Sequence, residues 1–190
     1  MTKKFKAKNM EKLDNPVRRK MLPPHEIVKG LNVESGKIVA DIGCGTGYFT
    51  IPFAKDLGEE GKVYAVDINP LMLEETNRRV EEENLRNVET IQSSENDFGL
   101  KESSVDVVFT STVFHEVDLP EKFLDECKRV LKENGDLIIL DWNSVEEEFG
   151  PPIHKRIDIE IVKKYVTEAN FNIKEIEYIG KSFYIVKCSL

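Results

Sequence analysis

The sequence has few of the residues that cross-link or anchor a chain. Its 190 residues include three cysteines, Cys44, Cys127 and Cys188, and no CxxC pair, so we expect neither a disulfide framework nor a zinc site. No apolar run is long enough to span a bilayer. Residues 1–8 are basic but lack the apolar core of a signal peptide, and we interpret them as a mobile tail. The sequence therefore predicts a cytoplasmic protein.

Positive charge is scarce as well. The chain has 27 Lys and Arg against 35 Asp and Glu, a formal net charge of -8, and its acids are spread along the whole length. This balance argues against a nucleic-acid partner, because a phosphate backbone is bound through a basic surface. We expect one domain over residues 1–190, with a helical segment at 1–36 and a core at 37–190. The oligomeric state stays open.

From residue 37 onward, short apolar runs alternate with amphipathic stretches, the pattern of βαβ units around a mostly parallel sheet. Runs rich in Val, Ile and Tyr predict seven strands, at 37–42, 62–68, 88–93, 105–111, 136–141, 172–179 and 182–189. Proline starts, glycine stops and helical periodicity predict helices at 17–22, 25–31, 48–57, 70–83, 120–132 and 159–169. The last two strands must be antiparallel, because their connection is too short for a parallel crossover.

Three glycines at alternate positions, Gly43, Gly45 and Gly47, follow the first predicted strand. In an open α/β sheet, ligands bind beyond the carboxyl ends of the strands, and glycines there allow a ligand to approach the backbone closely. A dinucleotide fingerprint, G-x-G-x-x-G, requires a third glycine at position 48, where the sequence has Tyr48. A nicotinamide-dependent oxidoreductase is therefore an alternative with less support.

This loop resembles the first motif of the class I S-adenosylmethionine-dependent methyltransferases, D/E-x-G-x-G-x-G, with Asp41 at its first position. The resemblance implies an α/β Rossmann-like three-layer sandwich with strand order 3-2-1-4-5-7-6 and strand 7 antiparallel. It also implies an acid that holds both ribose hydroxyls at the end of strand two, where Asp67 stands. A carboxylate can accept both hydrogen bonds. The implied cofactor is S-adenosyl-L-methionine, and the implied product is S-adenosyl-L-homocysteine.

The resemblance further implies adenine neighbours after strand three. Ser94 and Glu95 occupy this segment, although Ser94 stands where the family commonly has Asp. The complete predicted cofactor-binding set is Asp41, Gly43, Cys44, Gly45, Gly47, Asp67, Ile68, Ser94, Glu95 and Ser111.

One candidate for the chemistry, His115, follows strand four. Methyl transfer is an in-line displacement for which positioning alone supplies roughly 7–11 kcal/mol, so a general base is needed only if the acceptor must lose a proton. The chain resembles methyltransferases of the ubiquinone and menaquinone biosynthesis type, and many small-molecule methyltransferases of this kind carry a histidine here. His115 is therefore predicted either to act as a base or to pack against the cofactor. Leu119 interrupts any H-E-x-x-H pattern, so no metal site is expected.

The acceptor is expected to lie beside the long polar stretch that follows strand five. Such loops are usually functional or disordered, and we predict that residues 142–156 form a substrate lid. The candidate substrate-pocket residues are Glu116, Asp141, Trp142 and His154; Met21, Leu22, Phe5 and Met10 would close the other side. Trp142 would either face the substrate or pack under the loop. His154 and Arg156 would either receive an acidic substrate or lie on a solvated turn.

Together these features predict methyl transfer to a small-molecule acceptor. Residues 111–114 lack the Asn/Asp-Pro-Pro-aromatic motif of nucleic-acid amino-methyltransferases. Besides the oxidoreductase, a non-catalytic subunit that keeps the methyltransferase fold remains an alternative. The acceptor and its attacking atom stay open.

Overall fold

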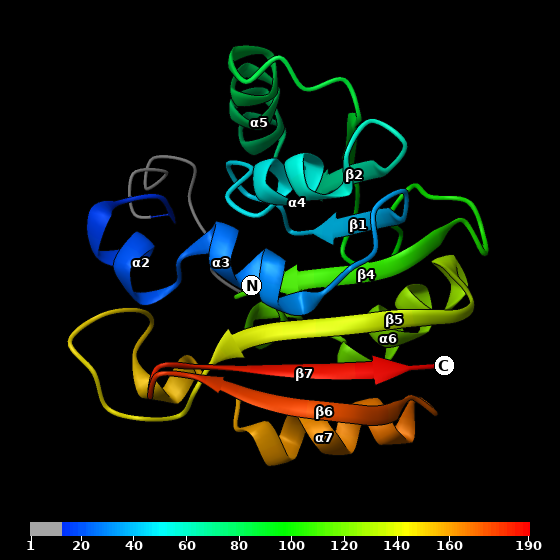
Figure 1. Ribbon diagram of the computed structural model, residues 1–190. Helices are drawn as coiled ribbons and strands as arrows, with labels where there is room; N and C mark the ends of the chain where they lie inside the picture. Colours follow the sequence, from blue (N-terminus) through cyan, green and yellow to red (C-terminus); the bar gives the residue numbers. More distant parts are fainter. Residues whose placement is uncertain (1–12) are drawn as a thin grey trace.

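A seven-stranded sheet forms the centre of the computed structural model, which describes residues 13–190 (Figure 1). Its strands are β1 (Ile38–Ile42), β2 (Lys62–Asp67), β3 (Val88–Gln92), β4 (Val105–Ser111), β5 (Leu131–Trp142), β6 (Asn172–Ile179) and β7 (Phe183–Ser189). They lie in the order β3-β2-β1-β4-β5-β7-β6. β7 is antiparallel to both of its neighbours, and the other pairs are parallel. The predicted strand order and mixed edge are thus confirmed.

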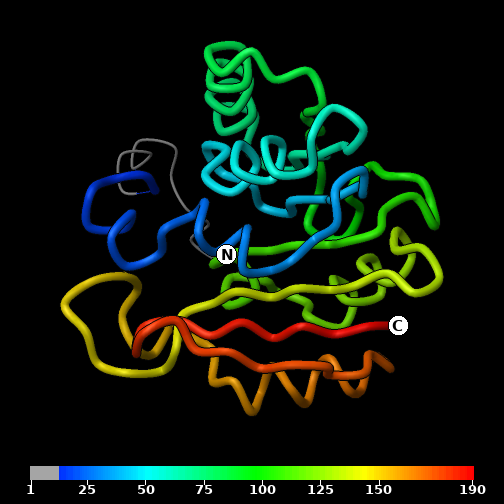
Figure 2. The backbone as a smooth tube through the Cα atoms, viewed as in Figure 1, coloured from blue at the N-terminus to red at the C-terminus, as the bar shows by residue number. Residues whose placement is uncertain are grey.

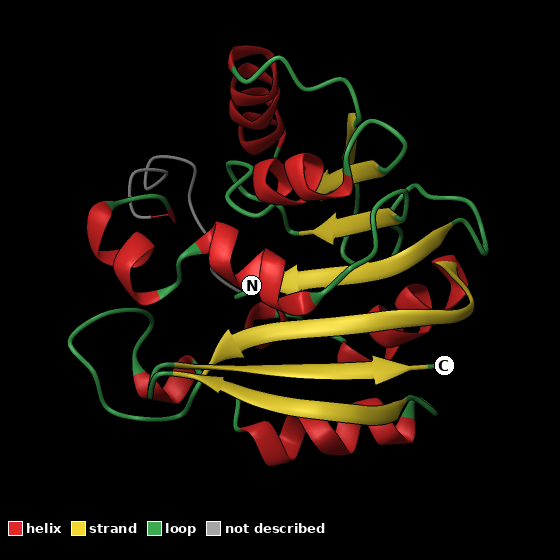
Figure 3. Ribbon diagram, viewed as in Figure 1, coloured by secondary structure: helices red, strands yellow, loops and turns green. Residues whose placement is uncertain are grey.

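Helices cover both faces of the sheet and complete the predicted three layers (Figure 3). The α-helices are α2 (Pro16–Met21), α3 (Pro24–Leu31), α4 (Thr50–Leu57), α5 (Pro70–Glu82), α6 (Pro120–Val130) and α7 (Ile159–Glu168), and two short 3₁₀ helices are η2 (Phe114–Glu116) and η3 (Ile153–Lys155). α3 and α4 pack on one face and α6 and α7 on the other. α5 lies against β2 and β3.

Alternation along the strands explains this layering. In β1, Val39 packs into the cluster under α3 and α4, whereas Ala40 packs into the cluster under α6 and α7. Phe109 of β4 is fully buried, and its ring centroid lies 5.0 Å from that of Phe53 on α4. Burying a side chain of this size contributes about 1.5–3 kcal/mol. Because both faces are covered, the central strands are apolar on both sides.

The connection between α6 and β5 differs from the predicted boundary. The helix expected over 120–132 ends at Val130, because Leu131 already pairs with Val105 of β4. Asn134 then adopts a φ of 70° in the irregular part of β5 before the regular pairing resumes at Asp136. The strand expected at 136–141 is therefore the regular part of a longer one.

The final hairpin places the end of the chain inside the sheet. Figure 2 shows that the chain runs along β6 at the edge and returns as β7 between β5 and β6. Gly180, at the turn, has a φ of 56°, a conformation that glycine adopts at little cost. This turn lies at the same edge of the sheet as the carboxyl ends of the parallel strands (Figure 1).

Near the start of the chain, α2 and α3 correspond to the two helices predicted on either side of the proline pair, Pro23 and Pro24. Asn15 caps α2, because its side chain accepts a hydrogen bond from the backbone N–H of Arg18. The tail predicted at residues 1–8, together with Phe5 and Met10, lies outside the described residues. Within residues 13–190, no helix combines the length and apolarity needed to cross a membrane.

Candidate functional site

A cavity of about 1030 Å³ opens at the carboxyl ends of the parallel strands. Its wall combines the glycine loop after β1, the end of β2, residues 93–98, the end of β4 with η2, the loop after β5, and α2. Figure 1 shows α2 and the loop after β5 at the same edge as the tips of β1, β4 and β5. The topology therefore gathers into one cavity segments that lie far apart in the sequence.

The glycine loop requires its glycines. Gly43, Gly45 and Gly47 have φ values of 73°, 57° and 80°, in the left-handed region that other residues enter at a cost. A Cβ on Gly43 would lie 2.4 Å from Cγ2 of Val113, and one on Gly47 would lie 3.2 Å from Cγ2 of Thr76. Gly43 and Gly45 line the cavity, whereas Gly47 lies outside its wall and packs against α5.

Backbone hydrogen bonds hold this loop in place. The N–H groups of Gly43 and Cys44 both donate to the carbonyl of Val66, at 2.8 and 3.0 Å. The Thr76 hydroxyl donates to the Gly45 carbonyl at 2.9 Å. Burial raises the pKa of the Cys44 thiol well above its usual value, so Cys44 lines the cavity as a neutral group.

Asp67 lies at the end of β2 and contacts the loop directly. Its Oδ2 accepts a hydrogen bond from the Gly45 N–H at 2.9 Å, and its Oδ1 accepts one from the Asn69 N–H at 2.8 Å. Burial raises the pKa of Asp67, although these N–H groups oppose the shift. Each carboxylate oxygen can accept more than one hydrogen bond, and the residue lines the cavity. Both oxygens can therefore accept two neighbouring hydroxyl groups.

Asp41 ties the end of β1 to the start of α4. It is 2% exposed, and its Oδ2 accepts a hydrogen bond from the Thr50 hydroxyl at 2.6 Å. Burial raises the pKa of Asp41 to about 7, and the nearby charge of Asp67 adds to this shift. Asp41 also lines the cavity.

The segment after β3 also lines the cavity, next to the glycine loop and the end of β2. Ser94 and Glu95 both line it, as does Ile68, which is 38% exposed. The Ser94 N–H donates to the Asp97 carbonyl at 3.0 Å, and Glu95 accepts a hydrogen bond from the Asp118 N–H at 2.7 Å. The segment is therefore joined to the turn before α6.

Two hydroxyl groups in the wall have no hydrogen-bond partner in the described part of the chain. The Oγ atoms of Thr46 and Ser111 are buried and have no hydrogen-bond partner among residues 13–190. Both residues line the cavity. Buried polar groups are nearly always satisfied, so these two atoms fit a polar ligand. Ser111 was predicted from the sequence, whereas Thr46 was missed although it lies within the motif.

His115 and Asp141 form a hydrogen-bonded pair. His115 Nδ1 lies 2.7 Å from Asp141 Oδ1, and its backbone N–H donates to Oδ2 at 3.0 Å. Asp141 is fully buried and also accepts from the Trp142 N–H. Because a carboxylate only accepts, Nδ1 carries the proton and Nε2 is the basic nitrogen of the neutral ring. His115 lines the cavity, and Asp141 stands behind it, outside the wall.

The charge of Asp141 controls the protonation of this histidine. Burial lowers the pKa of His115, but the charge and hydrogen bond of Asp141 outweigh that effect, so the pKa is raised above 6.5. Glu116, which also lines the cavity, has Oε1 3.9 Å from His115 Nε2 and adds to the rise. The pair is thus a base held in one orientation by a buried carboxylate.

Trp142 and the loop after β5 form the opposite end of the cavity. The Trp142 ring centroid lies 4.2 Å from that of Phe183, and a Cβ on Gly150 would lie 2.7 Å from the indole. Trp142 is thus packed under the loop and also lines the cavity, together with Phe149 and Lys155. This wall is largely apolar and carries one lysine.

Arg156 fastens this loop from within. Its guanidinium donates to the carbonyls of Pro151, Asn143, Val145 and Phe149 at 2.8–3.0 Å. The side chain is 1% exposed and lies outside the cavity wall. The arginine considered for an acidic substrate therefore binds backbone instead.

The remaining predicted residues are divided between the cavity and its surroundings. His154 is exposed and lies outside the wall. Met21 lines the cavity, whereas Leu22 is part of the core and accepts a hydrogen bond from the Tyr48 hydroxyl. Sequence reasoning missed Arg18, which lines the cavity from α2. Among residues 13–190, no three His, Cys, Asp or Glu side chains gather in a group able to hold a metal ion.

Comparison with known proteins gives consistent matches. A family model described as a methyltransferase domain matches residues 33–177. The crystal structure of an S-adenosylmethionine-dependent methyltransferase from Aquifex aeolicus is 33% identical and has a TM-score of 0.93, with 98% of this chain and 99% of that chain covered.

Curated relatives match over a shorter part of their length. The demethylmenaquinone methyltransferase of Geobacillus sp. (strain WCH70) is 30% identical over 124 residues, which are 65% of this chain and 53% of the relative. That of Listeria welshimeri is 33% identical over 116 residues, which are 61% and 49%. The chain thus spans about half the length of these relatives.

Proposed function

The chain belongs to the S-adenosylmethionine-dependent methyltransferases, and from this membership we propose that it transfers a methyl group from S-adenosylmethionine to a small acceptor with an apolar ring and an acidic hydroxyl group. The observation that carries the donor assignment is the contact of Asp67 with the glycine loop, where Oδ2 accepts from the Gly45 N–H at 2.9 Å. Neither the motif nor the comparisons support the oxidoreductase alternative.

The residues present fit this cofactor. Asp67 can accept both ribose hydroxyls, Gly43 and Gly45 leave room for close approach, and the unpartnered hydroxyls of Thr46 and Ser111 suit a polar ligand. When bound, S-adenosylmethionine supplies an electrophilic methyl group on a positively charged sulfur. The cavity of about 1030 Å³ lies at the upper end of the usual range for ligand pockets, which leaves space for an acceptor beside Trp142.

The pair formed by His115 and Asp141 supports an acceptor that must lose a proton. His115 Nε2 can take the proton of a hydroxyl group, and the resulting imidazolium is stabilised by Asp141 at 2.7 Å from Nδ1. The oxygen, or a ring carbon conjugated with it, then becomes the nucleophile. The apolar wall of Trp142 and Phe149 favours a ring, in keeping with the demethylmenaquinone in the names of the Geobacillus and Listeria relatives.

Calorimetry with S-adenosylhomocysteine tests the donor assignment. We expect micromolar binding by the wild type and a loss of about 10- to 100-fold in Asp67→Ala, because hydrogen bonds to a charged group are removed. Asp56→Ala changes an exposed acid on α4 and serves as the matched control. Absence of binding by the wild type, or equal binding by all three proteins, would contradict the proposal.

A further inference from the structure

Arg18 of α2 enters the cavity wall between two segments of the predicted cofactor site. Its Nη2 donates to the Thr112 hydroxyl at 3.3 Å, and its Cζ lies 4.8 Å from the centroid of the Tyr48 ring. Tyr48 directly follows the glycine loop, and Thr112 directly follows β4. The guanidinium therefore spans the space between the segments that carry the unpartnered hydroxyls of Thr46 and Ser111.

This guanidinium has unused binding capacity. Its Nε is buried without a hydrogen-bond partner, and no carboxylate among residues 13–190 forms an ion pair with it. Asp14, four residues earlier, is engaged elsewhere, because it bonds Arg19 and Arg79 at 2.6 Å each. A guanidinium presents its donors in a planar fork that matches a carboxylate. The cavity thus contains a cationic fork for which residues 13–190 supply no anion.

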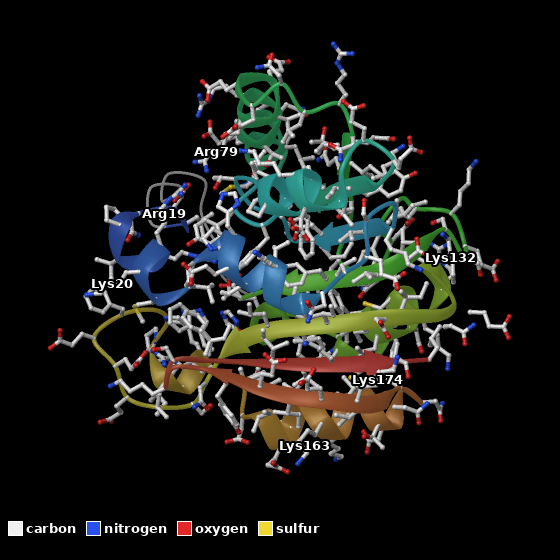
Figure 4. All side chains as sticks on the ribbon, viewed as in Figure 1. Arg19, Lys20, Arg79, Lys132, Lys163 and Lys174 are labelled. Atoms are coloured by element: carbon white, nitrogen blue, oxygen red, sulfur yellow. The ribbon has the colours of Figure 1, made fainter. Side chains whose placement is uncertain are left out.

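Contacts on both sides of Arg18 hold α2 in position. The bond between Asp14 and Arg79 ties the start of α2 to α5, and the Tyr48 hydroxyl donates to the Leu22 carbonyl at 2.8 Å. Figure 4 shows Arg19 and Arg79 near each other, whereas Lys20 lies on the outer side of the molecule. Arg18 is therefore presented to the cavity by a tethered helix.

We propose that Arg18 binds the carboxylate of the methionine part of S-adenosylmethionine, so that α2 completes the cofactor site and selects ligands with an intact amino-acid end. The inference rests on the proposed function. Thr46, Ser111 and Arg18, which carry the unpartnered polar atoms, line the same cavity as Asp67, and with the ribose at Asp67 these residues would be available to hold the amino-acid end of the cofactor. The carboxylate is the anionic group of this ligand, and Arg18 is the cation in that part of the wall.

The test is a thermodynamic cycle measured by calorimetry. S-adenosylhomocysteine and its decarboxylated analogue are each titrated into the wild type, Arg18→Met and Lys20→Met. In the wild type we expect the analogue to bind about 10- to 100-fold more weakly, the usual effect of a charge-assisted hydrogen bond. In Arg18→Met the affinity for S-adenosylhomocysteine should fall to that of the analogue, while the affinity for the analogue stays unchanged. Lys20→Met should behave as the wild type.

A second variant, Arg18→Gln, serves as a check in case Arg18→Met misfolds. Its side chain keeps hydrogen-bond donors near Thr112 but has no charge, so it should also lose the preference for S-adenosylhomocysteine over the decarboxylated analogue. A preference for the carboxylate that survives in both folded variants overturns the inference, as does equal weakening of both ligands. Absence of S-adenosylhomocysteine binding by the wild type would instead overturn the proposed function itself.

Discussion

At the end of the cavity formed by β1 and β2, the chain leaves each strand through a short turn held by backbone hydrogen bonds. At the β5 end, the chain instead runs through a long loop over residues 143–158 before α7 begins. The first end is held by N–H groups that donate to Val66 and Asp67. The second is held by side chains: Arg156 binds four carbonyls, Glu147 accepts from the Ser182 hydroxyl, and Asn143 donates to the Lys181 carbonyl.

This difference indicates that the two ends of the cavity are constrained to different degrees. The end formed by β1 and β2 is the one proposed to bind the methyl donor, and we call it the donor end. It is built from strand ends and glycine torsions, so few other residues can replace its parts. The β5 end is the one proposed to receive the acceptor, and we call it the acceptor end. It is a loop on the same scaffold, and loops can change in length and sequence without changing the sheet. A family can thus keep one methyl donor and vary the acceptor, since function is determined by the site and not by the fold.

The largest effect should come from Gly43→Ala at the donor end. The new Cβ would clash with Val113 at 2.4 Å and force a non-glycine residue to a φ of 73°. Overpacking and a left-handed backbone together should lower the free energy of unfolding by about 2–4 kcal/mol, measured by urea denaturation. Gly30→Ala is the control, because it meets no atom within 4 Å and should stabilise α3 by about 0.5–1 kcal/mol. A free energy of unfolding equal to that of the wild type in both variants would contradict the claim that the glycine loop tolerates no Cβ at position 43.

Arg156→Met should destabilise the loop at the acceptor end without affecting the donor end. Removal of the guanidinium leaves four carbonyls to find water, so we expect residues 143–156 to exchange amide hydrogens faster and the free energy of unfolding to fall by about 1–3 kcal/mol. The affinity for S-adenosylhomocysteine should stay within twofold of the wild-type value. Arg86→Met, which changes an exposed arginine, is the matched control. A large loss of ligand affinity in Arg156→Met would show that the two ends are coupled.

His115 lies between the donor end and the acceptor end, and Asp141 raises its pKa. An NMR titration should place its pKa above 6.5 in the wild type and lower it in Asp141→Asn, because the opposing charge is gone while burial remains. The pairing stabilises the fold fully below pH 6.5, and this contribution is lost as the pH rises through the folded-state pKa. The neutral base is populated above that pKa, so methyl transfer should increase with pH there. An unshifted pKa in Asp141→Asn would exclude the pair as the cause.

Phe149→Ala should have the smallest effect on stability. The side chain is 49% exposed, so the free energy of unfolding should change by less than about 0.5 kcal/mol. Because Phe149 lines the acceptor end, the change should appear in the KM for the acceptor and not in the affinity for S-adenosylhomocysteine. A change in the affinity for that ligand would contradict this placement.

The fold and the donor end could be predicted because their signals are local. Alternating apolar runs identify strands, and the glycine spacing with Asp67 carries the resemblance that implies the strand order. The pairing of His115 with Asp141 was not predictable in the same way, because it depends on the register that sets Ser111 of β4 beside Leu140 of β5. The binding of Arg156 to carbonyls and the approach of α2 to the glycine loop likewise leave no pattern in the sequence. For the same reason, the end of α6 was misplaced by two residues.

Backbone amide spectra titrated with S-adenosylhomocysteine test the central claim most directly. We predict that the largest shifts will be at Gly45 and Asn69, whose N–H groups donate to Asp67, and that residues 143–156 will change little. Shifts concentrated in 143–156, with Gly45 and Asn69 unmoved, would contradict the assignment of the methyl donor to the glycine loop.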